Sequence, residues 1–170
     1  MAIDGCAASF AELAGTLLPR YMVDMRSALE RSMPLAEFCM AGVGVRSILK
    51  GLHKTEDFAG CYVLTKGHRP FYVGISRGVV ARLRQHGTGR SHFDASLAYR
   101  MALERAPHKL TRSAAMKHSP FRDAFDQAKR LLMGSYVAFI EIPNPLELYL
   151  FEAYCAMALD TCKWNTFRTH

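Results

Sequence analysis

The sequence predicts an α/β fold of the α+β type, with a small three-stranded mixed/antiparallel sheet flanked by helices. Two short runs rich in Tyr, Val, Leu, Ile and Phe lie at 59–66 and 70–76, close enough to form a hairpin. A third run with alternating apolar residues lies at 134–142. The other segments have helical periodicity, and 170 residues with 50% hydrophobic content are enough to bury a core.

The first 57 residues predict helices and no recognisable chemistry. Ser9 and Glu12 form a capping-box pattern ahead of several leucines. A second helix is expected around Met22–Arg31, with a break near Pro34, and a third around Val43–His53. We therefore expect residues 1–57 to be a helical N-terminal extension packed on a domain that spans 58–170.

The hairpin and the helix after it have recognisable boundaries. Gly67 and Pro70 mark the turn between the two strands. Ser76 is placed to cap a helix that runs to about His86, and the glycines of 87–89 end that helix. Later elements follow in chain order: a helix at 94–106, a basic irregular segment at 107–121, a helix near 121–133, the third strand, and a final helix from Asn144 to about Leu159.

Positive charge is concentrated in one part of the chain. The net charge is +7. Residues 65–130 hold fourteen Lys and Arg against four Asp and Glu, whereas residues 1–64 hold six against seven. This excess favours a polyanionic partner, although a solvated basic surface explains the charge equally well.

Cysteine usage and hydropathy bear on the compartment. The chain has five cysteines and no CxxC pair, which indicates reduced thiols and neither a disulfide framework nor a zinc site. No apolar run reaches the roughly 20 residues that a membrane span needs. We expect a cytoplasmic protein that does not contact a membrane.

Four sequence elements in order carry the functional signal. They are Gly60-Cys61-Tyr62, Tyr72-Val73-Gly74, Arg82 and His86. Together they resemble the GIY-YIG nuclease superfamily, with Cys61 and Val73 in place of the isoleucines of the two name motifs. The resemblance implies a GIY-YIG-like fold and a metal-dependent endonuclease that hydrolyses DNA phosphodiester bonds.

The residue types suit phosphodiester hydrolysis, which needs a base, a cation for the charge on phosphorus, and help for the leaving oxygen. If the turn centres on Gly67, Tyr62 and Tyr72 lie directly opposite each other and point to one face. Either tyrosine can be the base, although strand tyrosines are otherwise ordinary packing residues. Arg82 and His86 share a helix face. Arg82 would hold the phosphate; His86 would contact a phosphate oxygen, relay a proton, or support the structure.

Two glutamates on the last helix compete as metal ligand. Glu147 lies three residues after Asn144, where helix capping explains it fully. Glu152 lies inside an apolar run, where an unpaired carboxylate is costly. The resemblance places a divalent ion, Mg²⁺ or Mn²⁺, on Glu152, so the expected catalytic set is Tyr62, Tyr72, Arg82, His86 and Glu152. It also matches Asn165 to a supporting asparagine.

The long separation of Arg82 and Glu152 implies a basic insertion at 88–133, suited to phosphate contacts. The expected DNA-binding residues are Arg77, Arg84, Arg90, Arg100, Arg105, Lys109 and Arg112, with a solvated surface as the alternative. Restriction endonucleases of the superfamily carry similar insertions. This favours a restriction enzyme that cuts double-stranded DNA over a repair or mobile-element nuclease, and a homodimer is left open.

Two other functions remain open from the sequence. One is a nucleic-acid-binding protein on the same fold with weak or lost catalysis. The other is a protein whose basic segment binds a protein or a small acidic ligand, in which case the motif is accidental. The two ideas differ in geometry, because an accidental motif has no reason to bring its five side chains together.

Overall fold

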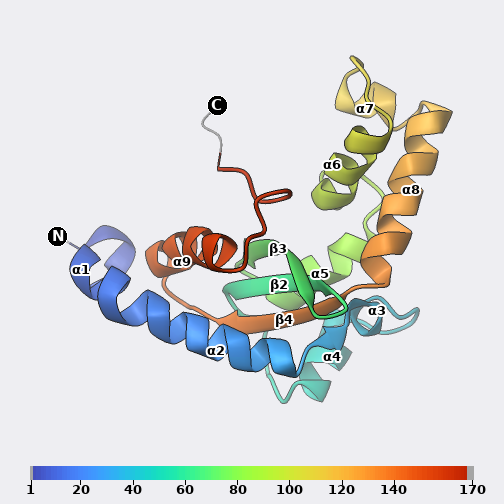
Figure 1. Ribbon diagram of the computed structural model, residues 1–170. Helices are drawn as coiled ribbons and strands as arrows, with labels where there is room; N and C mark the ends of the chain where they lie inside the picture. Colours follow the sequence, from blue (N-terminus) through green and yellow to red (C-terminus); the bar gives the residue numbers. More distant parts are fainter. Residues whose placement is uncertain (1, 168–170) are drawn as a thin grey trace.

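The computed structural model describes residues 2–167 and has an α+β fold built on one antiparallel sheet (Figure 1). The strands are β1 (Met33–Pro34), β2 (Gly60–Lys66), β3 (Arg69–Ser76) and β4 (Tyr136–Glu141), in the order β1-β4-β2-β3. The α+β class is confirmed, but the sheet has four strands where three were expected. The added strand is only two residues long and contains Pro34, which the sequence presents as a helix break.

The helices surround this sheet on both faces. A 3-10 turn (Ile3–Gly5) precedes the first α-helix, and a π-helical stretch (Leu13–Leu17) directly follows it. The α-helices are α1 (Phe10–Glu12), α2 (Leu18–Glu30), α3 (Leu35–Phe38), α4 (Val45–Gly51), α5 (Val79–Thr88), α6 (Ser96–Arg105), α7 (Arg112–Ala115), α8 (Ser119–Met133) and α9 (Pro145–Ala158).

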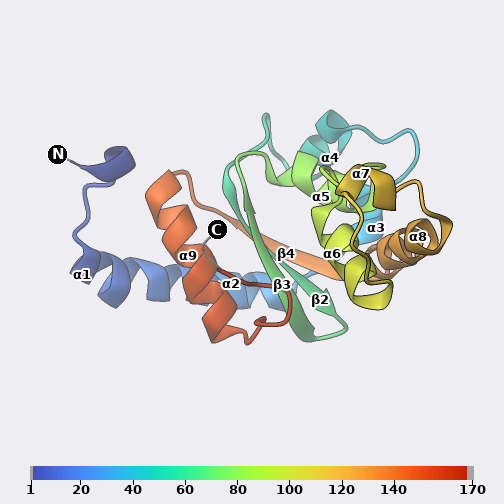
Figure 2. The same cartoon turned by 90° about the horizontal axis from the view of Figure 1, so that it is seen from above.

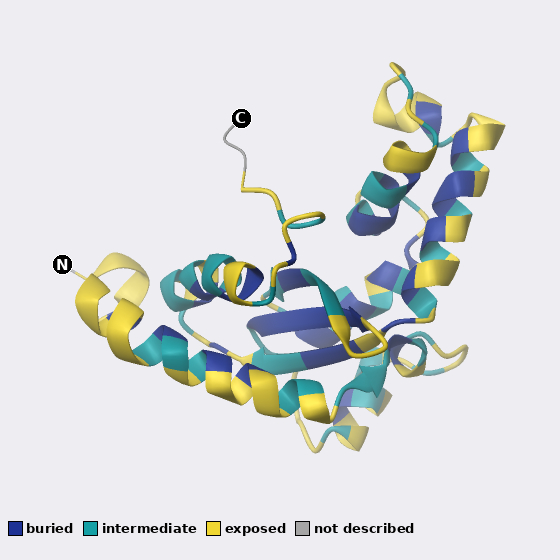
Figure 3. Cartoon of the chain, viewed as in Figure 1, coloured by how far each residue is buried: buried dark blue, intermediate teal, exposed yellow. Residues whose placement is uncertain are grey.

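The alternation of side chains along β2 divides the core into two layers. Tyr62 and Leu64 point to one face and pack with residues of α3, α5, α6 and α8. Cys61 and Val63 point to the other face and pack with α2 and α9. Figure 3 shows the central strands buried between these layers, with the exposed residues of α2 on its outer side. Because successive strand residues alternate, the sheet separates the two sets of neighbours.

The hairpin register differs from the expected one. Tyr62 pairs with Gly74, and Tyr72 pairs with Leu64, so the two tyrosines are diagonal neighbours and not directly opposite. A bulge between Leu64 and Thr65 shifts the pairing by one residue. The turn is Gly67-His68, with a positive φ of 58° at Gly67, and Pro70 lies within edge strand β3, where proline is tolerated.

The basic insertion forms an arm of helices at one end of the sheet (Figures 1 and 2). Helices α6 and α8 pack closely on each other, and Phe121 and Phe125 of α8 are buried. The segment expected to be irregular contains α7, whose first turn is capped by the Thr111 side chain. The apolar residues of the arm therefore belong to the same core as the face of the sheet that carries Tyr62 and Leu64.

The N-terminal segment packs along the sheet through α2, whose Met22 and Met25 are buried. The capping box of Ser9 and Glu12 is confirmed. Tyr21 bonds the Glu147 carboxylate at 2.5 Å, which ties α2 to the first turn of α9. Within residues 2–167, no helix has the length and apolar character needed to cross a membrane.

Candidate active site

Both motif glycines lie where a side chain has no room. A Cβ on Gly60 would overlap the carbonyl oxygen of Ile140 on the neighbouring strand β4. A Cβ on Gly74 would overlap the ring and hydroxyl of Tyr62, the residue of the neighbouring strand β2 that pairs with Gly74. The glycine of β3 thus makes the space that the tyrosine of β2 fills.

Three aromatic rings meet on this face of the sheet. The Tyr62 ring centroid lies 6.2 Å from that of Tyr72 and 5.5 Å from that of His86, and the Tyr72 and His86 rings are 6.1 Å apart. The Tyr62 hydroxyl and His86 Nε2 are 2.8 Å apart and hydrogen-bonded. Tyr62 and His86 are buried, whereas Tyr72 is partly exposed. Tyr72 is therefore the member of this ring cluster that a substrate can reach.

Burial controls the ionisation of the ring cluster. It lowers the pKa of His86 to about 3, with a further contribution from nearby Arg82, so the imidazole is neutral at physiological pH. Burial raises the pKa of Tyr62 well above its usual value, and the neighbouring Tyr72 raises it further. The pKa of Tyr72 is raised by burial and by Glu152, and Arg82 opposes this rise. Nδ1 of His86 is buried and has no hydrogen-bond partner among residues 2–167.

The insertion holds Arg82 beside the ring cluster. One guanidinium nitrogen donates to the Asp94 carbonyl at 2.7 Å and to Gln85 Oε1 at 3.1 Å, and the other donates to the Ser96 hydroxyl at 2.9 Å. All three acceptors are uncharged, so these contacts fix the side chain while leaving its charge uncompensated. An arginine in this state is suited to bind a phosphate.

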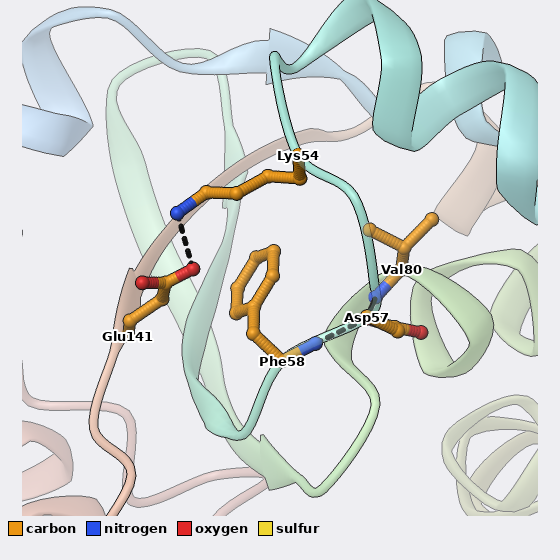
Figure 4. A network of polar contacts seen from close by, with 5 residues as sticks. All are labelled: Lys54, Asp57, Phe58, Val80 and Glu141. Atoms are coloured by element: carbon orange, nitrogen blue, oxygen red, sulfur yellow. Dashed lines mark hydrogen bonds and ion pairs between the residues drawn. The ribbon is translucent and has the colours of Figure 1, made fainter.

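Asp57 positions the helix that carries Arg82 and His86. Its carboxylate accepts hydrogen bonds at 2.9 Å from the backbone N–H groups of Val80 and Ala81, and also bonds the N–H of Phe58 (Figure 4). The expectation that Ser76 caps α5 is wrong, because the Ser76 hydroxyl bonds only the backbone of Gly78.

An ion pair in the same region, Lys54 to Glu141 at 2.5 Å, ties the segment before Asp57 to the end of β4 (Figure 4). In the sequence, Asp57 is marked only by its position shortly before a predicted strand. That position gives no reason to connect it with a helix more than twenty residues later.

The two glutamates of α9 have different surroundings. Glu147 accepts a hydrogen bond from Tyr21, has the Cys6 thiol 3.8 Å away, and has its backbone N–H capped by Asn144. Glu152 is half-buried, and within residues 2–167 its carboxylate makes no hydrogen bond or ion pair. Burial raises the pKa of Glu152. A carboxylate without a partner in such a place fits a divalent ion, and it is close enough to Tyr72 to influence that hydroxyl.

Asn165 closes the outer edge of β3. Its side-chain oxygen accepts from the Val73 N–H at 2.9 Å, and its amide nitrogen donates to the Val73 carbonyl at 2.8 Å. These two bonds pair the amide with the backbone as another strand would. Asn165 therefore supports the strand that carries Tyr72 and does not itself bond any of the five catalytic candidates.

The seven expected DNA-binding residues fall into two groups. Arg84 bonds the carbonyls of Phe38 and Val43, and Arg100 bonds the Trp164 carbonyl. Arg105 bonds Gln127, and Arg112 lies over the Tyr99 ring. The remaining three, Arg77, Arg90 and Lys109, are exposed. The first four thus make contacts within the protein that the sequence does not reveal, although Arg105 and Arg112 are exposed as well.

Tyr62, Tyr72, Arg82 and His86 lie close together, whereas Glu152 belongs to the helix on the opposite face of the sheet and is near enough to raise the pKa of Tyr72. Tyr62 and Tyr72 come from the hairpin, Arg82 and His86 from α5, and Glu152 from α9. Among the described residues, no group of three or more His, Cys, Asp or Glu is arranged to hold a metal ion. Searches against family models, curated proteins and solved structures found no match for this chain.

Proposed function

We propose that this protein is a metal-dependent DNA endonuclease of the GIY-YIG type. The observation that carries the proposal is that two motif tyrosines, the motif histidine and a fixed arginine meet on one face of the sheet, with Glu152 near enough to act on Tyr72. An accidental motif would give no reason for this convergence. The predicted location, the cytoplasm, agrees with the free cysteines of the chain.

In this proposal, Tyr72 is the tyrosine that acts on the substrate. Tyr62 is enclosed by Gly74 and bonded to His86, so its role is to hold the Tyr72 ring and the helix in place. Tyr72 takes the proton of the attacking water, and the positive charge of Arg82 favours the phenolate form that this step needs. The free charge of Arg82 also stabilises the additional negative charge on phosphorus.

Glu152 would hold Mg²⁺ or Mn²⁺, since the carboxylate is half-buried and without a partner. When bound, the ion supplies a Lewis acid for the phosphate oxygens and favours the ionised forms of neighbouring groups. Glu147 is the weaker choice because Tyr21 already occupies its carboxylate. The substrate class that fits the basic insertion best is double-stranded DNA, cut in the manner of a restriction enzyme acting as a homodimer.

One observation favours a second candidate, a nucleic-acid-binding protein with weak or lost catalysis. Tyr62 and His86 are 1% and 0% exposed, so neither touches solvent or a substrate in this conformation. If the chemistry needs both residues at the phosphate, this protein binds DNA and does not cut it.

Cleavage of plasmid DNA separates the two candidates. The wild-type protein with Mg²⁺ is expected to cut, and Glu152→Ala is expected to lose at least about 100-fold in rate while keeping its affinity for DNA. Glu147→Gln is the matched control on the same helix and is expected to cut normally, with lower stability because the Tyr21 bond is weakened. No cleavage by the wild-type protein, together with tight binding, would favour the second candidate.

A further inference from the structure

A large cleft lies at the hairpin end of the sheet. Its volume is about 630 Å³, and its walls come from the hairpin turn, α6, the end of α8 and the segment after α9. Phe71 in its wall directly precedes Tyr72. The size falls in the range of sites that hold one small organic molecule, about 300–1,000 Å³, which is too small for a duplex.

The cleft carries an excess of positive charge. Lys66, Arg69, Arg105, Arg130 and Lys163 line it, against the carboxylates of Glu104 and Asp160. Lys163 pairs with Glu104 at 2.9 Å, and Arg105 bonds Gln127. Within residues 2–167, Lys66, Arg69 and Arg130 take part in no ion pair, and all three are exposed. These three charges are available to an anionic ligand.

Aromatic side chains lie beside these charges. Trp164 and Phe71 are partly exposed and line the cleft. The Trp164 carbonyl accepts a hydrogen bond from Arg100, whose guanidinium is also close enough to act on the Tyr72 hydroxyl. Arg100 thus joins the cleft to the candidate active site.

We propose that this cleft holds one or two unpaired nucleotides of the substrate, stacked on Trp164 and Phe71, with their phosphates on Lys66, Arg69 and Arg130. A cationic groove with aromatic side chains is the arrangement that binds single strands without sequence preference. The inference rests on the proposed function for the substrate. It adds that DNA with an unpaired flank next to the cut is preferred over fully paired DNA.

The chain has one tryptophan, and it lies in the cleft, so intrinsic fluorescence reports on this site directly. The full-length protein is titrated in EDTA with three DNA probes: a blunt duplex, the same duplex with a single-stranded flank, and a short oligothymidylate. Polyglutamate is titrated as a polyanion without bases. Because EDTA prevents metal-dependent cleavage, binding is measured whether or not the protein is a nuclease.

The flanked duplex and the oligothymidylate are expected to quench Trp164 fluorescence, and polyglutamate is not. The flanked duplex is expected to bind about tenfold more tightly than the blunt one. Arg69→Gln combined with Arg130→Gln is expected to remove this preference. Arg26→Gln, which changes an exposed arginine on α2 across the sheet, is the control and is expected to keep it.

Three results would overturn the inference: equal affinity for blunt and flanked duplexes, equal quenching by polyglutamate, or equal loss of the preference in the Arg26 control. Circular dichroism and thermal unfolding establish that the variants are folded, and the three exposed arginines are chosen because they pack no core. If the preference holds but no probe is cut in Mg²⁺, the cleft assignment stands and the nuclease proposal fails.

Discussion

The two faces of the sheet differ in the kind of side chain they bury. On one face β2 and β3 present Tyr62, Tyr72 and Gly74 to His86 of α5, so titratable rings replace part of an apolar core. On the other face the same strands present Cys61, Val63 and Val73 to α2 and α9, and the layer is apolar. Polar groups therefore cost stability on one face, and the apolar layer on the other offsets that cost.

The largest expected effect on stability is on the apolar face. Met25 of α2 is fully buried, so Met25→Ala is expected to lower the free energy of unfolding by about 2–5 kcal/mol. Val23→Ala on the same helix removes an exposed side chain and is expected to change it by less than about 0.5 kcal/mol. Urea unfolding gives both values. Similar losses for the two variants would mean that α2 is not part of the core.

On the face that holds Tyr62, Tyr72 and His86, the change of Arg82 is expected to affect activity. Arg82→Ala is expected to reduce DNA cleavage by about 10²–10³-fold, because it removes a fixed charge at the phosphate. Arg26→Ala, at an exposed arginine on α2, is the control and is expected to cut at a nearly normal rate. Cleavage rates under single-turnover conditions measure the difference, and equal rates for both variants would contradict the role of Arg82.

The buried imidazole of His86 makes the stability of the folded protein sensitive to acid. His86 has a pKa of about 3 in the folded protein, below its unfolded value near 6.5, so the unfolded state binds a proton first as the pH falls. Stability is therefore full above about pH 6.5 and falls below it, by up to about 1.4 kcal/mol per pH unit.

Replacing the imidazole tests this pH dependence. In His86→Gln, the difference in unfolding free energy from the wild-type protein is expected to shrink as the pH falls from 6.5 toward 4. His68→Gln, at an exposed histidine in the hairpin turn, is expected to leave the pH dependence as it is. Equal slopes for His86→Gln and the wild-type protein would contradict the neutral, buried state.

The smallest expected effect concerns exposed charges of the insertion. Removing one cation that binds a phosphate lowers the slope of log affinity against log salt by about 0.9 on duplex DNA. Arg90→Gln and Lys109→Gln remove exposed charges, whereas Arg84→Gln removes one already bonded to backbone carbonyls. Binding isotherms at several salt concentrations are expected to show a lower slope for the first pair only. A lower slope for Arg84→Gln alone would place the DNA on the other side of α5.

Local signals were enough to predict most elements of the fold. The strand runs, the capping box at Ser9 and the proline at the start of α9 all reflect interactions between near neighbours, which a sequence displays directly. Strand β1 was missed because it consists of two residues that pair only through the distant β4. The tyrosine register was wrong for two reasons: the turn is Gly67-His68 and not centred on Gly67, and the bulge between Leu64 and Thr65 shifts every partner beyond it by one more residue.

The site was predictable in its residue types and not in their contacts. Tyr62, Tyr72, Arg82 and His86 lie together, but burial encloses Tyr62 and His86, and Glu152 lies on the helix of the opposite face. The contacts that fix them come from Asp57, Asp94 and Ser96, whose chemistry is visible only when distant segments meet. For the same reason Arg84 and Arg100 look like DNA contacts in the sequence although the protein's own carbonyls hold them.

The Asn165 amide on β3 has a consequence for self-association. An edge strand offers unpaired backbone groups to which a second molecule can add a strand of its own. Here one side chain occupies the N–H and the carbonyl of Val73 at the middle of that edge. A second copy could add a strand along the middle of β3 only by displacing the Asn165 amide, which makes this edge a poorer template for joining two sheets.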